Sequence, residues 1–305
     1  MNIQYTTARP PDLPAGARVL VTGGHGFVGR HLVAAILRTP GVALTIADRR
    51  AEGSRDVVVD LTDRESVRAG LGGGRFDFIF HCAGVIDQGV RPGLYEAQWA
   101  AHGLATLHLI EEVAGTTSRL VQIGSSTEYG DAPCPQAPGG PACPNSAYGA
   151  SKLAATAIVR AKCSSEGLRA VVVRPFLIYG EGQTAKCFLG LAIEAARKRS
   201  EFPTSPGGQT RDFVPVDWVV RDLLRAATDD SAVGRVVNSC TGHETTLRDV
   251  LAMVTKLAPG FQPAFGAVPY RATELMRSAG VPYTPVSAEE ARRRLELFLS
   301  NQICL

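Results

Sequence analysis

Short apolar runs alternate with longer stretches of helical spacing along most of the chain. The short runs are apolar at nearly every position, which is typical of parallel strands buried on both faces. Helices are expected at residues 27–38, 98–114 and 148–166. Strands are expected at residues 17–22, 42–47, 57–59, 76–80, 120–123, 170–173 and 236–238. This pattern predicts an α/β protein with a doubly wound parallel sheet.

A glycine-rich loop joins the first expected strand to the first expected helix. It reads TGGHGFVG over residues 22–29, and Asp48 ends the second strand about 20 residues later. Glycines at this spacing let the backbone turn sharply and approach a pyrophosphate, while the helix N-terminus offers free amide donors. The sheet is therefore expected to be of the Rossmann type. The cofactor-binding residues predicted here are Gly23, Gly26, Phe27, Val28, Gly29, Asp48 and Arg49.

The carboxylate at position 48 also bears on the choice of cofactor. An acidic residue there accepts hydrogen bonds from the adenosine ribose, which favours NAD. Arg49 and Arg50 stand beside Asp48 and could hold the additional phosphate of NADP. The cofactor is expected to be NAD, with NADP left open.

A second motif supplies candidate proton-transfer chemistry. Tyr148 and Lys152 are four residues apart in an expected helix, so their side chains share a face. A lysine cation favours the phenolate and lowers the pKa of the tyrosine, which makes it usable near neutral pH. Ser125 and Ser126 end an earlier strand, where a hydroxyl can donate to a substrate carbonyl. The four are predicted as catalytic residues.

Composition narrows the class of protein further. The 32 basic and 29 acidic residues are spread along the chain without a lysine-rich block, so no nucleic-acid partner is expected. Seven cysteines and six histidines lack the spacing of zinc ligands, so we expect no metal. The odd number of cysteines argues against a disulfide framework, so we expect a cytoplasmic location. No apolar run approaches the roughly 18 residues that span a bilayer, so no membrane partner is expected.

The same patterns suggest how the chain is divided. Residues 1–15, rich in proline, are expected to form a flexible leader. Residues 16–175 with about 209–242 are expected to form the dinucleotide-binding domain. Residues from about 176–208 and 243–305 are expected to form a smaller, mainly helical substrate-binding lobe. The helices at 98–114 and 148–166 are the expected contacts of a homodimer.

An ordered series of motifs resembles one known family, the extended short-chain dehydrogenase/reductases. These are NAD(P)-dependent nucleotide-sugar epimerases, dehydratases and reductases, and the likeness spans about residues 17–275. The motifs are TGGHGFVG at 22–29, DLTD at 60–63, HCAG at 81–84, GSSTEYG at 124–130, YGASK at 148–152, RPFLIYGEGQ at 174–183, RDFVPVDW at 211–218 and NSCTG at 238–242.

The resemblance implies a role for each matching residue. Tyr148 would be the acid/base, Lys152 would bind the nicotinamide ribose and Ser125 would polarise the substrate. Arg211 and Arg271 would contact the nucleotide diphosphate. The further cofactor-binding residues implied are Asp60, Leu61, Cys82, Ala83, Gly84 and Pro175. The substrate-binding residues implied are Ser125, Ser126, Thr127, Phe176, Leu177, Arg211 and Arg271.

Three departures from the family pattern bear on the reaction. Dehydratases of the family place a glutamate where this chain has Thr127, and Glu128 follows one position later. In an extended segment consecutive residues point to opposite sides, so Glu128 should not replace that base and a dehydratase is disfavoured. Leu177 and His102 each stand where an asparagine is usual, so substrate contacts have changed.

The leading hypothesis is an oxidoreductase that acts at C4 of a nucleotide sugar. The motifs look most like GDP-4-keto-6-deoxymannose reductases, which favours a 4-ketoreductase with Tyr148 as acid/base. One alternative is a nucleotide-sugar 4-epimerase with tightly bound NAD. Two others are a ketoreductase or dehydrogenase for a non-sugar metabolite, and a non-catalytic cofactor-sensing protein.

Overall fold

A computed structural model describes residues 11–304, except 88, 114, 116 and 272, and leaves the side chains of residues 117 and 118 undescribed. Most of the expected leader, residues 1–10, lies outside the described residues. Within its described part, Leu13 is buried against the main core.

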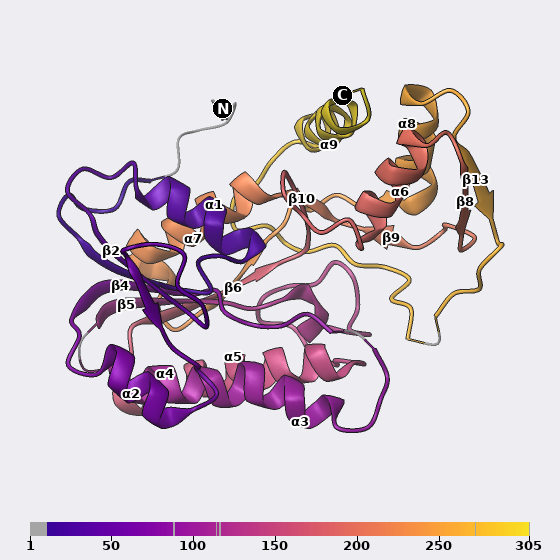
Figure 1. Cartoon of the computed structure of the whole chain (residues 1–305). Coiled ribbons are helices and arrows are strands. Elements are labelled where there is room, and N and C mark those ends of the chain that lie inside the picture. The colour runs from indigo at the N-terminus through magenta and orange to yellow at the C-terminus, as the bar shows by residue number, and fades with distance from the viewer. Residues whose placement is uncertain (1–10, 88, 114, 116, 272, 305) are drawn as a thin grey trace.

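A seven-stranded sheet forms the centre of the fold (Figure 1). Every neighbouring pair in it is parallel, and the strand order is β11-β6-β5-β4-β1-β2-β3. The order reverses between β1 and β4, and ligands of sheets of this kind bind at the carboxyl ends of the strands at such a reversal. The strands are β1 (Arg18–Thr22), β2 (Ala43–Asp48), β3 (Asp56–Val58), β4 (Phe76–His81), β5 (Thr117–Ile123), β6 (Ala170–Pro175) and β11 (Val236–Ser239).

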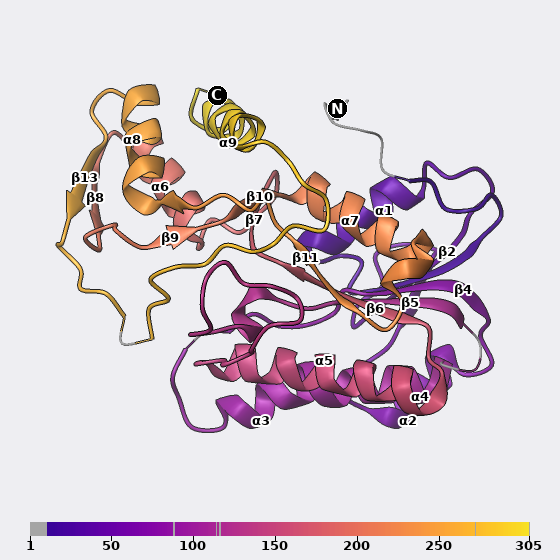
Figure 2. The same ribbon diagram turned by 180° about the vertical axis from the view of Figure 1, so that it is seen from behind.

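Helices cover both faces of this sheet, as Figures 1 and 2 show. Along β1, Val19 and Val21 pack on one side and Leu20 on the other, because successive side chains of a strand alternate. The first face is covered by α1 (Phe27–Ile36) and α7 (Val216–Thr228). The second face is covered by α2 (Arg64–Leu71), α4 (Ala105–Val113) and α5 (Ala147–Glu166). The predicted doubly wound α/β fold is confirmed.

The helix expected at 98–114 is composite. It comprises α3 (Leu94–Trp99), a π-helical turn η1 (Ala100–Leu104) and α4. A π-helical turn adds a residue to the helix and changes the direction of the side chains around it. The turn carries His102 and Gly103 inward, where both are buried.

A second apolar cluster lies beside the sheet, at the other end of the molecule in Figure 1. Helices α6 (Phe188–Arg197), α8 (Leu247–Leu257) and α9 (Ala288–Ile303) build it. The short paired strands around it are β7 (Leu177–Tyr179) with β10 (Phe213–Pro215), β8 (Glu201–Thr204) with β13 (Gln262–Phe265), and β9 (Thr210–Arg211) with β12 (Thr245–Thr246). The remaining short elements are the 3-10 turns η3 (Ser126–Glu128) and η4 (Asp230–Ala232).

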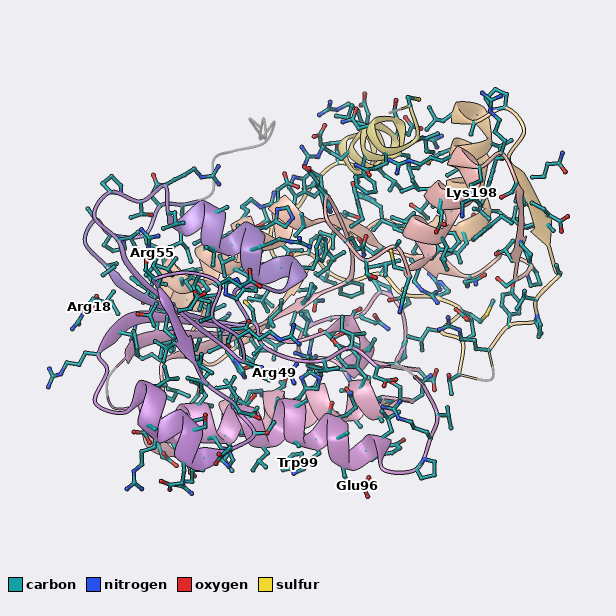
Figure 3. All side chains as sticks on the ribbon, in the orientation of Figure 1. Arg18, Arg49, Arg55, Glu96, Trp99 and Lys198 are labelled. Carbon is teal, nitrogen blue, oxygen red and sulfur yellow. The ribbon has the colours of Figure 1, made fainter. Side chains whose placement is uncertain are left out.

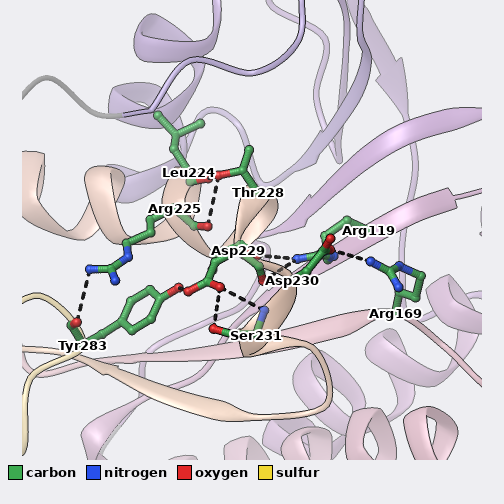
Figure 4. A network of polar contacts seen from close by, with 10 residues as sticks. Arg119, Arg169, Leu224, Arg225, Thr228, Asp229, Asp230, Ser231 and Tyr283 are labelled. Carbon is green, nitrogen blue, oxygen red and sulfur yellow. Dashed lines mark hydrogen bonds and ion pairs between the residues drawn. The ribbon is translucent and has the colours of Figure 1, made fainter.

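A polar network ties the C-terminal segment to the end of α7 (Figure 4). The Tyr283 hydroxyl donates to Asp229 at 2.6 Å, and the Arg225 guanidinium stacks 4.4 Å from the Tyr283 ring. Arg119 of β5 donates to the Asp229 carbonyl at 3.1 Å, and both it and Arg169 pair with Asp230. The segment that leads into α9 is thereby fixed to the sheet.

Two functional features are absent from the described part of the chain. None of the helices there is long and apolar enough to cross a membrane. No group of three or more His, Cys, Asp or Glu side chains there could hold a metal ion. All seven cysteines are free thiols.

Candidate active site

The loop between β1 and α1 forms a tight cradle of backbone. Gly23 adopts a φ of +67°, and a Cβ there would lie 2.6 Å from the Ala83 Cα. A Cβ on Gly29 would lie 2.1 Å from the Gly23 carbonyl oxygen. Side chains would therefore fill the space between this turn and the end of β4. A backbone so exposed at a helix N-terminus fits a dinucleotide pyrophosphate.

Replacing Gly29 with alanine is expected to lower NADH affinity at least about 100-fold, because the turn must open to admit the methyl group. Isothermal titration calorimetry measures this change. Gly53→Ala is the matched control, because a Cβ at Gly53 meets nothing within 4 Å. Equal affinities for the two variants would mean that the turn does not hold the cofactor.

Carboxylates lie at the ends of the next two strands. Asp48 Oδ1 accepts from its neighbour's amide, Arg49 N, at 2.7 Å. The Asp60 carboxylate accepts from the Thr62 hydroxyl at 2.7 Å and from its amide at 2.9 Å. These bonds, with the charge of Arg49, lower the pKa of Asp60. Asp48, Asp60 and Arg49 thus lie at the edge of the sheet where the sequence predicts contacts with the cofactor.

The candidate proton donor lies at the start of α5. The Ser146 hydroxyl caps this helix by accepting from Gly149 N at 3.1 Å, so Tyr148 falls in the first turn and Lys152 in the second. Both side chains are buried. Lys152 Nζ donates to the Ile123 carbonyl at 3.0 Å. The Ser125 hydroxyl bonds to the Thr127 hydroxyl at 2.8 Å and lies close enough to the Tyr148 phenol to lower its pKa. The structure therefore brings Ser125, Tyr148 and Lys152 together.

The pKa of Tyr148 moves opposite to the direction that the Tyr-Lys pair predicts. Burial raises it to about 12, and the hydrogen bond from Ser125 only partly offsets that rise. Burial also lowers the pKa of Lys152 to about 8. The expectation that lysine makes the phenol acidic is thus wrong for this structure. At neutral pH the phenol keeps its proton and can donate it.

The backbone around Glu128 differs from the extended segment expected from the sequence. Residues Ser126–Glu128 form a 3-10 turn and not an extended segment, and Ser125 and Glu128 close a capping box. The Glu128 carboxylate is fully buried and accepts from Ser125 N, from the Thr156 hydroxyl at 2.7 Å and from Arg174 Nε at 2.8 Å. It holds Ser125 in place and does not reach outward as a base.

The other predicted residues lie at the strand ends but differ in exposure. Ser126 and Thr127 are half-buried beside Ser125, and Pro175 ends β6 in a buried position. Phe176 packs in the core, where its ring lies 6.3 Å from that of Tyr129. Leu177 opens β7 against the second cluster.

The residues after β3 and β4 also follow the expected order. Leu61 is buried, and its carbonyl accepts from His108 at 3.1 Å. Burial raises the pKa of the Cys82 thiol to about 12, which fits a packing role. Phe27 and Val28 open α1, with Val28 packed against the core.

Two arginines predicted for phosphate binding lie near each other. Arg211 pairs with Glu274 and donates to the Leu275 carbonyl at 2.6 Å. Burial lowers the pKa of Arg211, and the charge of Arg271 lowers it further. Arg271 itself is exposed. Arg211 is therefore already held by Glu274, a contact that the motif did not reveal.

His102 is part of this site, although the sequence pointed only to a changed substrate contact at this position. Its ring centroid lies 5.4 Å from that of Tyr148 at an interplanar angle of 75°. The available signal was the replacement of an asparagine at this position. Its inward direction depends on the π-helical turn, which apolar spacing does not reveal.

A parallel sheet with a pyrophosphate cradle beside a buried serine, tyrosine and lysine defines the class of Rossmann oxidoreductases. Residues 19–240 match the NAD dependent epimerase/dehydratase family. The chain belongs to that family. The expectations of an enzyme and of a nicotinamide cofactor are thereby confirmed, as is the resemblance stated from the motifs.

Individual relatives cover most of the chain. It is 35% identical over 257 residues to dTDP-6-deoxy-L-talose 4-dehydrogenase (NAD(P)(+)) of Kitasatospora kifunensis, covering 79% of each chain. It is 28% identical to GDP-6-deoxy-D-mannose reductase of Pseudomonas aeruginosa, covering 79% of this chain and 80% of that one. The structure of UDP-glucose 4-epimerase with UDP-glucose from Thermotoga maritima has the same fold. The TM-score is 0.82 at 20% identity, with coverage of 94% and 97%.

Proposed function

We propose that this protein is an NAD(P)-dependent 4-ketoreductase of a nucleotide-activated 6-deoxy sugar. The observation that carries the proposal is a buried Tyr148 phenol that keeps its proton at neutral pH and lies beside the Ser125 hydroxyl. Reduction of a carbonyl needs an acid beside the carbonyl oxygen, and this pair offers two hydroxyls there. The 35% identical relative is named as a 4-dehydrogenase of such a sugar, which supports the same position of attack.

Ser125, Tyr148 and Lys152 each have their own task in the proposed reaction. Ser125 donates a hydrogen bond to the C4 carbonyl oxygen and polarises it. Tyr148 transfers its proton to that oxygen as negative charge develops there. Lys152 binds the nicotinamide ribose, because its ammonium can donate hydrogen bonds to the ribose hydroxyls. The cofactor, when bound, supplies the hydride.

Dehydration of the sugar is a poorer fit to these residues. A dehydratase needs a base that removes a proton next to the ketone. Glu128 is fully buried and pairs with Arg174 at 2.6 Å, and Thr127 carries no charge. A carboxylate fixed in this way is not available as that base.

We place the sugar nucleotide in the lobe formed by about residues 176–208 and 243–305. Arg211 and Arg271 at its edge offer positive charge to a diphosphate. Glu274 holds Arg211 meanwhile, so binding would exchange one anionic partner for another. Because Arg211 would have an anionic partner before and after binding, its buried charge would not be left unpaired when the substrate arrives.

Incubation with 4-keto-6-deoxy sugars of dTDP, GDP and UDP tests the proposed reaction. We expect oxidation of added NADH or NADPH at 340 nm in step with formation of the 4-hydroxy sugar. The relatives named as epimerases make 4-epimerisation the second candidate. A protein that is purified with bound NAD, and that interconverts 4-hydroxy sugars without added cofactor, would replace the reductase by the epimerase.

Lys152→Met is expected to abolish reduction while making the protein more stable by about 2 kcal/mol at pH 7. Burial depresses the pKa of Lys152 from 10.5 to about 8, so the folded state is penalised for holding the ammonium below pH 8. This penalty fades as the pH rises from about 8 to 10.5, because the folded protein releases the proton first. Urea unfolding at pH 7 and pH 10 measures the difference. A variant that is less stable at pH 7 would contradict the assigned cost of burial.

We also propose that the protein is a homodimer. Tyr95 and Trp99 of α3 are 64% and 43% exposed, and Trp99 projects away from the sheet in Figure 3. Large exposed aromatic residues on one helix favour contact with a second copy. Sedimentation equilibrium is expected to give twice the chain mass of 32.3 kDa, and Trp99→Glu is expected to give the monomer. A monomeric wild-type protein would exclude this assembly.

A further inference from the structure

A buried ring nitrogen of His102 has no protein partner. The His102 side chain is 2% exposed, and its Nε2 lies 3.0 Å from the Val85 carbonyl oxygen. Nδ1 finds no hydrogen-bond partner within the described part of the chain. A buried polar atom without a partner is costly, so native proteins rarely keep one unless something else binds there.

The contact with Val85 fixes which nitrogen carries the proton. A carbonyl oxygen only accepts, so Nε2 must donate and Nδ1 is left bare if the ring is neutral. Burial, aided by the positive charge of Lys152, lowers the pKa of His102 to about 3, so the ring is neutral. Nδ1 is therefore an acceptor at any pH at which the protein is folded and active.

The space beside Nδ1 is shared with the ammonium of Lys152. A Cβ on Gly84 would lie 2.9 Å from His102 Nδ1 and 3.6 Å from Lys152 Nζ. A Cβ there would also lie 2.5 Å from His102 Cε1, so the imidazole ring lies directly against Gly84, and Nδ1 and Nζ are both close to that glycine. One offers only a lone pair and the other offers only hydrogens. A hydroxyl or water oxygen satisfies both at once, since it accepts from the ammonium and donates to the imidazole.

We propose that His102 is a positioning residue that, with Lys152, binds a single O–H group beside Gly84. The group is either a water molecule or a hydroxyl of the nicotinamide ribose, and the inference rests on the proposed cofactor site. An O–H group that donates to Nδ1 turns its oxygen toward Nζ and stabilises the ammonium. His102 therefore keeps Lys152 charged to a higher pH.

The other groups around Lys152 do not replace this acceptor. Glu128 and Cys82 favour the charged form through space, and the ammonium of Lys152 itself disfavours charge on His81 as on His102. Glu128 is already bonded to Ser125, Thr156 and Arg174. Lys152 Nζ already donates one hydrogen bond, to the Ile123 carbonyl at 3.0 Å. Among the described residues near Nζ, the neutral His102 Nδ1 is an acceptor that has no partner.

A pair of substitutions separates the two ring nitrogens. His102→Asn keeps an acceptor near the place of Nδ1, whereas His102→Gln keeps a donor near the place of Nε2 and lacks the acceptor. The readout is the affinity for NADH from pH 6 to pH 9, measured by calorimetry. Thermal melting confirms that both variants are folded, and the conservative His102→Asn variant serves if His102→Gln does not fold.

In the wild type, affinity should fall as Lys152 loses its proton near pH 8. In His102→Gln this fall should move about one pH unit to the acid side, while His102→Asn should follow the wild type. Equal affinities of His102→Gln and the wild type at pH 6 would identify the O–H group as water. An approximately tenfold weaker binding already at pH 6 would identify the ribose hydroxyl.

Three results would overturn the inference, and only the last of them also overturns the proposed function. If the wild type binds NADH and all three proteins share one pH dependence, or if His102→Asn shifts as His102→Gln should, His102 has no such role and the proposed function stands. If the wild type does not bind NADH or NADPH at all, the proposed function and this inference both fail.

Discussion

Tyr148→Phe is expected to lower kcat about 10³-fold while the KM for the sugar nucleotide stays within about threefold. The substitution removes the phenolic proton and keeps the ring, whose centroid lies 5.4 Å from that of His102. Because the phenol is buried and protonated, its loss leaves the carbonyl oxygen without its acid. Steady-state reduction with NADH or NADPH measures the effect.

Ser125→Ala is the comparison for this variant. It removes the hydroxyl beside Tyr148 and keeps the proton donor, so a smaller loss of about 10- to 100-fold is expected. A Tyr148→Phe protein with more than a tenth of the wild-type kcat would show that another group supplies the proton.

Glu128→Gln is expected to lower the free energy of unfolding by about 4 kcal/mol. The carboxylate is fully buried and bonded to Arg174, whose guanidinium lies 4.5 Å from the Tyr129 ring. Neutralising the acid leaves the buried guanidinium without its counter-charge. Urea unfolding of the wild type and variant measures the difference.

An exposed ion pair gives the control for this prediction. Glu65 and Arg68 lie 3.5 Å apart with more than two thirds of each side chain exposed, so Glu65→Gln should change stability by less than about 0.5 kcal/mol. Comparable losses for the two variants would mean that the Glu128 pair does not hold the turn beside Ser125.

The sheet and its cofactor loop could be predicted because their signals are local. Runs such as residues 170–173 are apolar throughout, and strand β6 is buried along its whole length. The expected strands fall within a few residues of the observed ones. The glycine loop is equally local, since Gly23 and Gly29 are required by close contacts within one turn and with the residues after β4.

The site was less predictable where direction or burial decides. Ser125 and Glu128 fit a Ser-x-x-Glu capping box, so the 3-10 turn could have been predicted, whereas treating the segment as extended hid it. The raised pKa of Tyr148 depends on burial by elements distant in sequence. The contact of Arg211 with Glu274 likewise joins residues that no motif relates.

Transfer of deuterium from the reduced cofactor tests the central claim most directly. The protein would be given a 4-keto-6-deoxy sugar nucleotide with [4-²H]NADH or [4-²H]NADPH of each stereochemistry, and the product would be analysed by mass spectrometry and proton NMR. Direct hydride transfer to C4 should give one deuterium at C4 of the sugar from one of the two labelled forms, and almost none with Tyr148→Phe. A 4-hydroxy product without deuterium, or deuterium incorporation that survives Tyr148→Phe, would contradict it.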